Sequence, residues 1–155
     1  MEKMDTAMAA RVWQRVRGEA TAPEAIFGLQ GLAAAEMAEA AALAQMSGMT
    51  QGRSQRVLRQ LAQQDRAHAA CLKGIQAMAM GSAPHLRTAP PVPEEPETAL
   101  RKCCGRKMKA LAQYEARAQD PEFGCVFAEL ARQERAHCCQ LLELLGMQAE
   151  PGSRL

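Results

Sequence analysis

The chain has 155 residues, of which 48% are hydrophobic and only 3% aromatic, and its formal net charge at pH 7 is +2. This length suits one domain with a buried core. Residues that favour helices dominate, whereas the β-branched residues typical of sheets are scarce. We therefore expect an all-α protein. The basic residues are dispersed along the chain, so its charge does not predict a nucleic-acid partner.

The sequence also predicts the cellular compartment of the protein. No apolar run approaches the length of a membrane span, and the start of the chain lacks the apolar core of a signal peptide. Six cysteines without an export signal indicate a reducing compartment, where thiols stay free or bind metal. We therefore expect a soluble, cytoplasmic protein without a membrane partner. Association into a homodimer is left open.

The chain is predicted to form two helical hairpins that a proline-rich linker separates. In chain order they are an N-terminal helix (5–18) that packs outside through Met8, Val12 and Trp13, a first hairpin (23–80), a proline-rich crossover linker (81–97), a second hairpin (98–146) and a tail (147–155). Proline cannot continue a helix, which sets the limits of the linker. Within the second hairpin, Asp120 is predicted to cap the last helix, with Pro121 and Glu122 in its first turn.

Two segments of the chain repeat one pattern. They align without a gap as VLRQLAQQDRAHAACL (57–72) and VFAELARQERAHCCQL (126–141). The alignment pairs Asp65 with Glu134 and His68 with His137. A carboxylate three residues before a histidine puts both side chains on one face of a helix. Two such pairs on two helices are the working parts of a dinuclear metal site in a four-helix bundle.

Both pairs lie within stripes of apolar residues at helical spacing. The stripes are Leu58, Leu61, Asp65, His68, Leu72 and Ile75 in the first repeat, and Phe123, Phe127, Leu130, Glu134, His137, Leu141 and Leu144 in the second. The pairs are therefore expected to be buried. A lone charge in a core is costly, so buried carboxylates are normally paired or bound to metal.

Antiparallel hairpin geometry predicts which residues lie level with these pairs. With turns near residues 50 and 120, Glu36 lies level with the pair of the first hairpin and Lys107 with the pair of the second. No Asp or Glu occurs at residues 98–114, so no shift of register recovers a second carboxylate. A cation is therefore expected where a symmetric site would have an anion.

These residues resemble the rubrerythrin-like branch of the ferritin-like superfamily over residues 27–145. The family pattern is a glutamate seven residues before a tyrosine on the first and third helices, and E-x-x-H on the second and fourth. The matching residues are Glu36, Asp65 with His68, Tyr114, and Glu134 with His137. The departures are Leu43 for the first tyrosine, Asp65 for a glutamate, and Lys107 for the third-helix glutamate.

The resemblance implies a ferritin-like antiparallel four-helix bundle and a di-iron carboxylate site that handles oxygen or peroxide. The CxxC pairs of the rubredoxin module are absent. Three carboxylates and Lys107 sum to a charge of −2, which one divalent ion would neutralise. We therefore expect one iron ion, or alternatively manganese or zinc, in an incomplete oxidoreductase site. Its expected ligands are Glu36, Asp65, His68, Glu134 and His137.

Two alternatives place Lys107 differently. In the first, Lys107 forms ion pairs with Glu134 and Asp65, no metal binds, and the bundle acts through partners or self-association without catalysis. In the second, Lys107 extends to solvent and contributes nothing.

The cysteines give a rival interpretation. Cys71, Cys104 and Cys138 are expected to lie near one end of the site, where they would favour zinc or a redox-active disulfide. Neighbouring residues on a helix point about 100° apart, so only one member of the Cys103–Cys104 pair is expected to face inward. Cysteine also serves simply as a small buried hydrophobe, which is the structural alternative.

Overall fold

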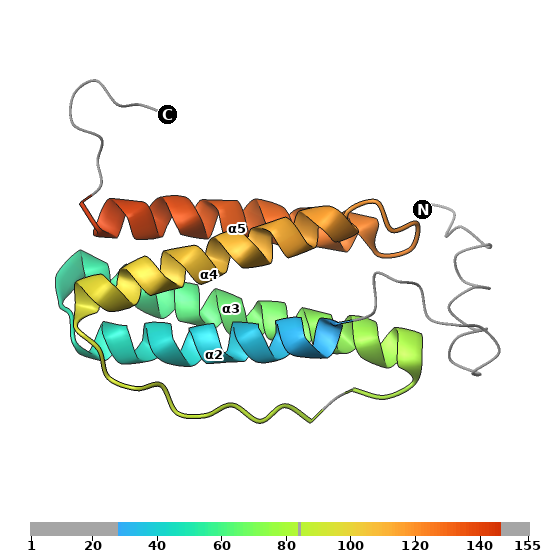
Figure 1. The fold of residues 1–155 in the computed structure, drawn as a ribbon, viewed down its shortest axis with the longest axis horizontal. Coiled ribbons are helices and arrows are strands. Elements are labelled where there is room, and N and C mark those ends of the chain that lie inside the picture. Colours follow the sequence, from blue (N-terminus) through green and yellow to red (C-terminus); the bar gives the residue numbers. More distant parts are fainter. Residues whose placement is uncertain (1–27, 84, 147–155) are drawn as a thin grey trace, which may run out of the picture.

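The structure is a computed structural model that describes residues 28–83 and 85–146 (Figure 1). This part of the chain folds into four α-helices and contains no strand: α2 (Leu29–Gly48), α3 (Gly52–Met80), α4 (Pro96–Arg117) and α5 (Gly124–Leu144). The all-α prediction is therefore confirmed for the described residues. The predicted helix at 5–18 with Met8, Val12 and Trp13, the start of the first hairpin at 23–27 and the tail at 147–155 lie outside them.

The four helices form a bundle of two hairpins, α2–α3 and α4–α5 (Figure 1). The linker after α3 runs back along the bundle, so α3 and α4 point in the same direction. Contacts between the hairpins join α2 to α4 and α3 to α5. As a result, every helix runs antiparallel to the neighbours that it contacts most. None of the described helices has an apolar stretch long enough to cross a membrane.

Helix α4 begins where the linker supplies a cap. The carboxylate of Glu95 accepts hydrogen bonds from the backbone N–H groups of Glu97 and Thr98, and Pro96 takes the first helical position. Proline is tolerated there because its missing N–H would have no helical partner. The helix therefore begins at Pro96, two residues before its predicted start.

The turn between α4 and α5 differs from its prediction. Asp120 accepts hydrogen bonds from the backbone N–H groups of Glu122 and Phe123 at 3.0 and 2.7 Å, so it caps a turn before the helix. Helix α5 itself begins at Gly124. A Cβ atom at Gly124 would collide with the carbonyl oxygen of Ala118, so the chain can pass this close only with glycine. The prediction that Asp120 caps α5 directly is wrong.

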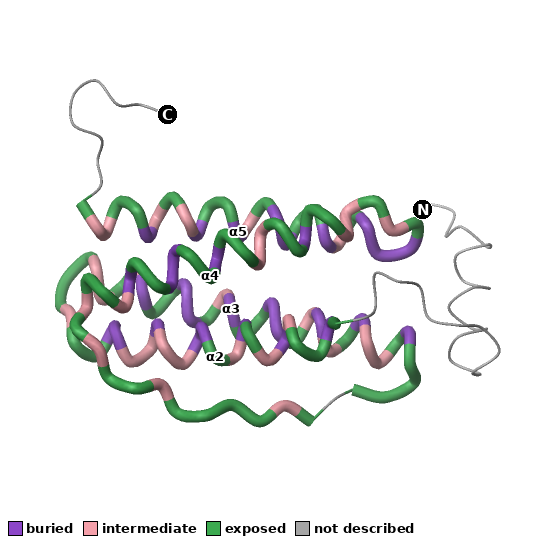
Figure 2. Tube along the Cα trace, in the orientation of Figure 1, coloured by how far each residue is buried: buried purple, intermediate pink, exposed green. Residues whose placement is uncertain are grey.

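Buried residues recur along all four helices, on the sides that face the other helices (Figure 2). The predicted stripe of α3 is buried throughout, and that of α5 is buried except for the half-buried Leu144. The apolar residues form two clusters, one containing Leu29, Leu72, Tyr114 and Phe127, the other Leu43, Leu58, Leu61, Cys103 and Leu141. The first lies at the α2 N-terminal end of the bundle and the second at the opposite end. Polar residues occupy the space between.

Candidate metal centre

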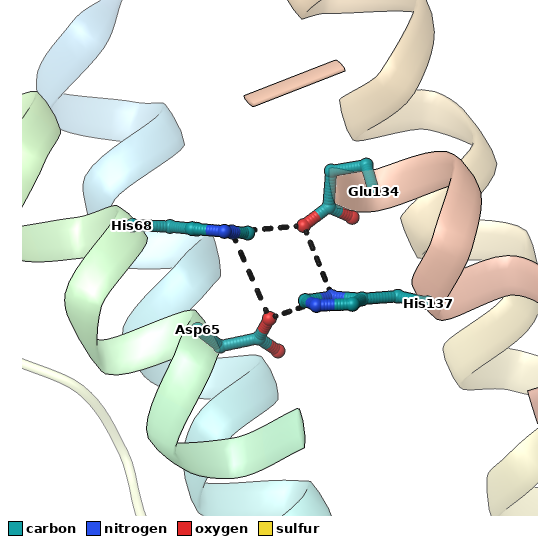
Figure 3. Close-up of side chains that lie close together, drawn as sticks. All are labelled: Asp65, His68, Glu134 and His137. Carbon is teal, nitrogen blue, oxygen red and sulfur yellow. Dashed lines mark hydrogen bonds and ion pairs between the residues drawn. The ribbon is translucent and has the colours of Figure 1, made fainter. Parts of the chain in front are cut away.

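A polar centre of six buried side chains lies between the two apolar clusters. All four helices contribute to it, through Glu36 (α2), Asp65 and His68 (α3), Lys107 (α4), and Glu134 and His137 (α5). Figure 3 shows the four residues of the repeated motif, which point toward one another from α3 and α5. One ligand atom from each of these four lies within 4.8 Å of the others. The structure thus brings together the residues that the sequence analysis placed at one level, and this group could hold a metal ion.

The two repeats exchange contacts across the bundle. His68 Nδ1 lies 3.1 Å from Glu134 Oε1, and His137 Nδ1 lies 3.3 Å from Asp65 Oδ1. The two imidazole rings stack with their centroids 5.3 Å apart and an angle of 11° between their planes. Each histidine therefore faces the carboxylate of the other repeat, and its Nδ1 atom points into the centre (Figure 3).

Two glutamines hold the outer nitrogens of these histidines. Gln133 Oε1 lies 2.7 Å from His68 Nε2, and Gln64 Oε1 lies 2.7 Å from His137 Nε2. Each glutamine directly precedes the carboxylate of its own repeat and contacts the histidine of the other. Neither glutamine was predicted as part of the site, although the alignment of the repeats pairs Gln64 with Gln133.

The orientation of Gln133 fixes where His68 carries a proton. The Gln133 amide nitrogen donates to Glu129 Oε1 at 2.8 Å, so its oxygen must face His68 and accept from Nε2–H. Histidines that bind metals usually hold their second ring nitrogen in a hydrogen bond of this kind, which sets the ring orientation and the tautomer. His68 is therefore arranged to present Nδ1 as a ligand.

Lys107 lies inside the polar centre with 1% of its surface exposed. Its ammonium donates to Asp65 Oδ1 and, at 3.1 Å, to Glu134 Oε1, and it lies 3.8 Å from Glu36 Oε2. The alternative in which Lys107 extends to solvent is therefore wrong. Lys107 shares the buried face of α4 with Leu100, Cys104 and Tyr114, so its side chain leaves the helix toward the core.

Tyr114 orients Glu36. Its hydroxyl donates to Glu36 Oε1 at 2.5 Å, while Glu36 Oε2 lies 3.7 Å from His68 Nδ1. Among the described residues, three carboxylate oxygens of the centre have no hydrogen-bond partner: Glu36 Oε2, Asp65 Oδ2 and Glu134 Oε2. Buried carboxylate oxygens are normally hydrogen-bonded, so Asp65 Oδ2 and Glu134 Oε2 are acceptors that a cation could use.

The histidines take up protons readily in this environment. Burial opposes a charged imidazole, but the hydrogen bond to Glu134 and the nearby carboxylate of Glu36 raise the pKa of His68 to about 10. Burial likewise opposes protonation of His137, yet the carboxylates of Asp65 and Glu134, 3.3 and 3.6 Å from its Nδ1, raise its pKa as well. Without a metal ion, protons on these rings therefore offset carboxylate charge.

Lys107 stays charged for the same reason. Burial alone would lower its pKa, but the surrounding carboxylates of Asp65, Glu36 and Glu134 raise it. Burial raises the pKa of Glu36, against the effects of His68 and Lys107. The ammonium is therefore the fixed positive charge of the centre, whereas the histidine protons can leave.

The structure corrects the placement of the thiols. Cys71 packs against the apolar cluster that contains Tyr114, whereas Cys104 belongs to the opposite cluster. Because α3 and α5 run in opposite directions, residues that follow the motif on the two helices diverge toward opposite ends (Figure 1). The prediction that Cys71, Cys104 and Cys138 share one end is therefore wrong.

Cys103 and Cys104 are both buried, so the prediction that only one faces inward is also wrong. Cys103 fits because its Sγ atom donates to Glu39 Oε2 on α2 at 2.8 Å. All six cysteines lie in the described residues and are free. Burial raises the pKa of Cys71, Cys104 and Cys138, the last to about 11, which keeps these thiols protonated and poorly suited to metal binding.

No protein-family model matches this chain, and a search of curated proteins finds no match either. The resemblance to rubrerythrin-like proteins therefore rests on the motif residues and their arrangement alone.

Proposed function

We propose that this protein binds one divalent transition-metal ion in the polar centre, through Asp65, His68, Glu134 and His137. The observation that carries this proposal is the buried grouping of four ligand atoms within 4.8 Å of one another. Two imidazoles with two carboxylates suit iron, manganese or zinc. The glutamine contacts to both histidines supply the supporting hydrogen bonds that such ligands normally have.

The donor set fits one ion and not two. Asp65 and Glu134 each contact Lys107 through one oxygen and keep the other without a hydrogen bond, so both could hold a cation while keeping that contact. Three ionised carboxylates and one ammonium sum to −2, the charge that one divalent ion neutralises. A second ion would have to lie beside the ammonium of Lys107, which repels it.

We further propose that the chain is a ferritin-like bundle related to the rubrerythrin-like proteins. Two D/E-x-x-H motifs, the order of the helix directions and the long crossover linker support this relationship. Reduction of oxygen or peroxide in such centres uses two metal ions, and Lys107 leaves room for one. We therefore propose metal binding by an incomplete site, without turnover.

A second candidate is a metal-free bundle in which ion pairs fill the centre. The hydrogen bonds from Lys107 to Asp65 and Glu134 favour it, as do the raised pKa values of both histidines. In that state one ammonium and two imidazolium groups balance the carboxylates. The two candidates differ in whether a metal ion replaces the histidine protons.

Metal content distinguishes the candidates. Metal-free protein is incubated anaerobically with Fe²⁺, and in parallel with Zn²⁺, then desalted and analysed for bound metal. We expect about one ion per chain, falling to about a tenth of that or less in His137→Gln. His85→Gln, which alters an exposed histidine of the linker, is the matched control and should bind like the wild type. Folded protein that binds no ion at neutral or alkaline pH would establish the metal-free candidate.

A further inference from the structure

A cavity of about 590 Å³ opens to solvent between α2 and α4, next to the polar centre. Three alanines of α2 form part of its wall, Ala35, Ala38 and Ala42, and linker residues Pro91 and Val92 border it. The alanines span two helical turns, about 10 Å along the helix axis. A mostly apolar cavity of this volume is typical of sites for small organic molecules.

The inner end of the cavity is closed by Glu36 and Lys107 of the polar centre together with Tyr114. They are 3%, 1% and 0% exposed, respectively. Tyr114 donates to Glu36 Oε1, and Glu36 Oε2 has no hydrogen-bond partner among the described residues. An acceptor that is nine-tenths buried therefore remains unused at the end of an apolar cavity.

A donor lies beside this acceptor. The Lys107 ammonium uses two of its protons on Asp65 and Glu134, and its nitrogen is 3.8 Å from Glu36 Oε2, too far for a hydrogen bond. One atom that both accepts and donates could reach both groups at once. A hydroxyl oxygen meets this requirement, because it carries one proton and two lone pairs.

The charges of the neighbouring residues disfavour a ligand with an ionised head group. A carboxylate would meet the anionic oxygen of Glu36, and an ammonium would meet the ammonium of Lys107. At the mouth, Arg106 pairs with Glu39 and Lys102 pairs with Glu94, so most of the charge there is offset. The inner end of the cavity therefore disfavours a charged head group, whereas Lys109, which also lines the cavity, gives its mouth one further positive charge.

We propose that this cavity binds an uncharged, elongated apolar molecule with a terminal hydroxyl, such as a long-chain primary alcohol. The chain lies along the alanines of α2, and the hydroxyl accepts from Lys107 and donates to Glu36 Oε2. No metal ion takes part in these contacts, so the inference stands apart from the proposed metal site.

Calorimetric titration of chelator-treated protein tests the proposal with four probes of equal chain length: decanol, decane, decanoate and decylammonium. We expect decanol to bind about tenfold more tightly than each of the others, the effect of one or two buried hydrogen bonds. Equal binding of decane and decanol would show that the hydroxyl contributes nothing and would overturn the proposal. Tighter binding of either ion would overturn it as well.

Substitutions test whether the alcohol binds in this cavity. Ala38 is exposed within the open cavity, so Ala38→Phe fills the space without disturbing packed residues, and we expect at least about tenfold weaker decanol binding. Ala112→Phe, at an exposed position of α4 outside the cavity, is the matched control and should not change affinity. Glu36→Gln should weaken the preference for decanol over decane, because the carboxylate acceptor is lost while the contact of the hydroxyl with Lys107 remains.

Two results would contradict this assignment. Wild-type affinity in Ala38→Phe would place the alcohol elsewhere on the protein. A concentration-dependent dimer that dissociates in Ala38→Phe would assign the cavity to a second copy of the chain. Because all titrations use metal-free protein, a failure of the proposed metal site would leave these outcomes unchanged.

Discussion

The two hairpins contribute matching halves to the polar centre and differ in one charge. Helices α3 and α5 each supply a glutamine, a carboxylate and a histidine in the same order, and each histidine contacts the other helix. At the level of these motifs, α2 supplies Glu36 whereas α4 supplies Lys107. The repeat therefore sets the geometry of the centre, and the residue on α4 sets its charge.

This difference explains why the centre is compatible with two states. An ammonium and three carboxylates leave two negative charges, which either one divalent ion or two histidine protons can neutralise. A fourth carboxylate in place of Lys107 would leave four negative charges, more than the two imidazoles can balance. We therefore expect the asymmetry between α2 and α4 to permit a folded metal-free protein.

The largest expected effect comes from giving both hairpins a carboxylate at the position that Glu36 and Lys107 occupy. Lys107→Glu replaces the buried ammonium by a fourth carboxylate, so we expect the metal-free protein to lose about 3–5 kcal/mol of unfolding free energy. With metal present, we expect about two ions per chain instead of about one. Chemical denaturation with and without Zn²⁺, combined with metal analysis, measures both effects.

Lys109→Glu provides the control for this charge reversal, because Lys109 is exposed on the same helix. It should bind about one ion and change stability by less than about 0.5 kcal/mol. A Lys107→Glu protein that is as stable as wild type without metal would contradict the role assigned to Lys107.

The next expectation concerns pH and separates the two states. The pKa of His68 is raised from 6.5 to about 10, so its protonation stabilises the metal-free fold fully below pH 6.5 and ceases to do so as the pH rises through 10. Between these limits, we expect the metal-free protein to lose about 1.4 kcal/mol of unfolding free energy per pH unit for each proton released. Metal affinity should change in the opposite direction, rising about tenfold per pH unit for each proton that the bound metal displaces.

Denaturation and metal titration at several values between about pH 7 and pH 9 measure these slopes. His68→Gln is the informative comparison, because it removes the titrating ring while keeping a polar side chain. If the metal-free protein became more stable with rising pH over this range, the proton-balanced state of the centre would be ruled out.

Equivalent roles for the two glutamines can be tested directly. Gln64→Leu and Gln133→Leu each remove the acceptor for one histidine Nε2–H, and we expect each to lower metal affinity by about 10–100-fold. Gln133 is itself held by Glu129, so its loss should have the larger effect. Gln63→Leu, at the exposed position next to Gln64, is the control. A similar loss in Gln63→Leu would show that the effect is not specific to the histidine contacts.

The positions of Glu36 and Lys107 along the bundle axis were predictable because two constraints act on each hairpin together. Apolar residues at helical spacing define the buried face of each helix, and a short turn fixes the register of the two helices that it joins. These constraints apply within a hairpin. They therefore placed Glu36 beside the first motif and Lys107 beside the second without any tertiary information.

Contacts between the hairpins were not predictable in this way. No short turn joins α3 to α5, so the exchange that brings Gln64 to His137 and Gln133 to His68 depends on how the hairpins pack. The same limitation explains the error for Cys71, whose distance from Cys104 depends on the relative direction of helices from different hairpins. The early start predicted for α5 failed for a local reason, the tight passage of Gly124 against Ala118.

The smallest expected effect compares one ion pair between the hairpins with one inside a hairpin. Arg53, near the start of α3, lies 3.2 Å from Glu143 of α5, and Arg135 of α5 pairs with Glu115 of α4. The side chains of Arg53 and Glu143 are 74% and 54% exposed, so we expect Glu143→Gln to cost only about 0.5 kcal/mol in urea denaturation, and less at high salt.

Glu115→Gln should cost a similar amount, because its ion pair is about as exposed. Neither substitution should alter metal affinity, since both pairs lie on the surface, outside the polar centre. Weaker metal binding in Glu143→Gln but not in Glu115→Gln would contradict this expectation. It would show that the surface ion pair between the hairpins helps to set the distance between α3 and α5, on which the contacts of each histidine with the other helix depend.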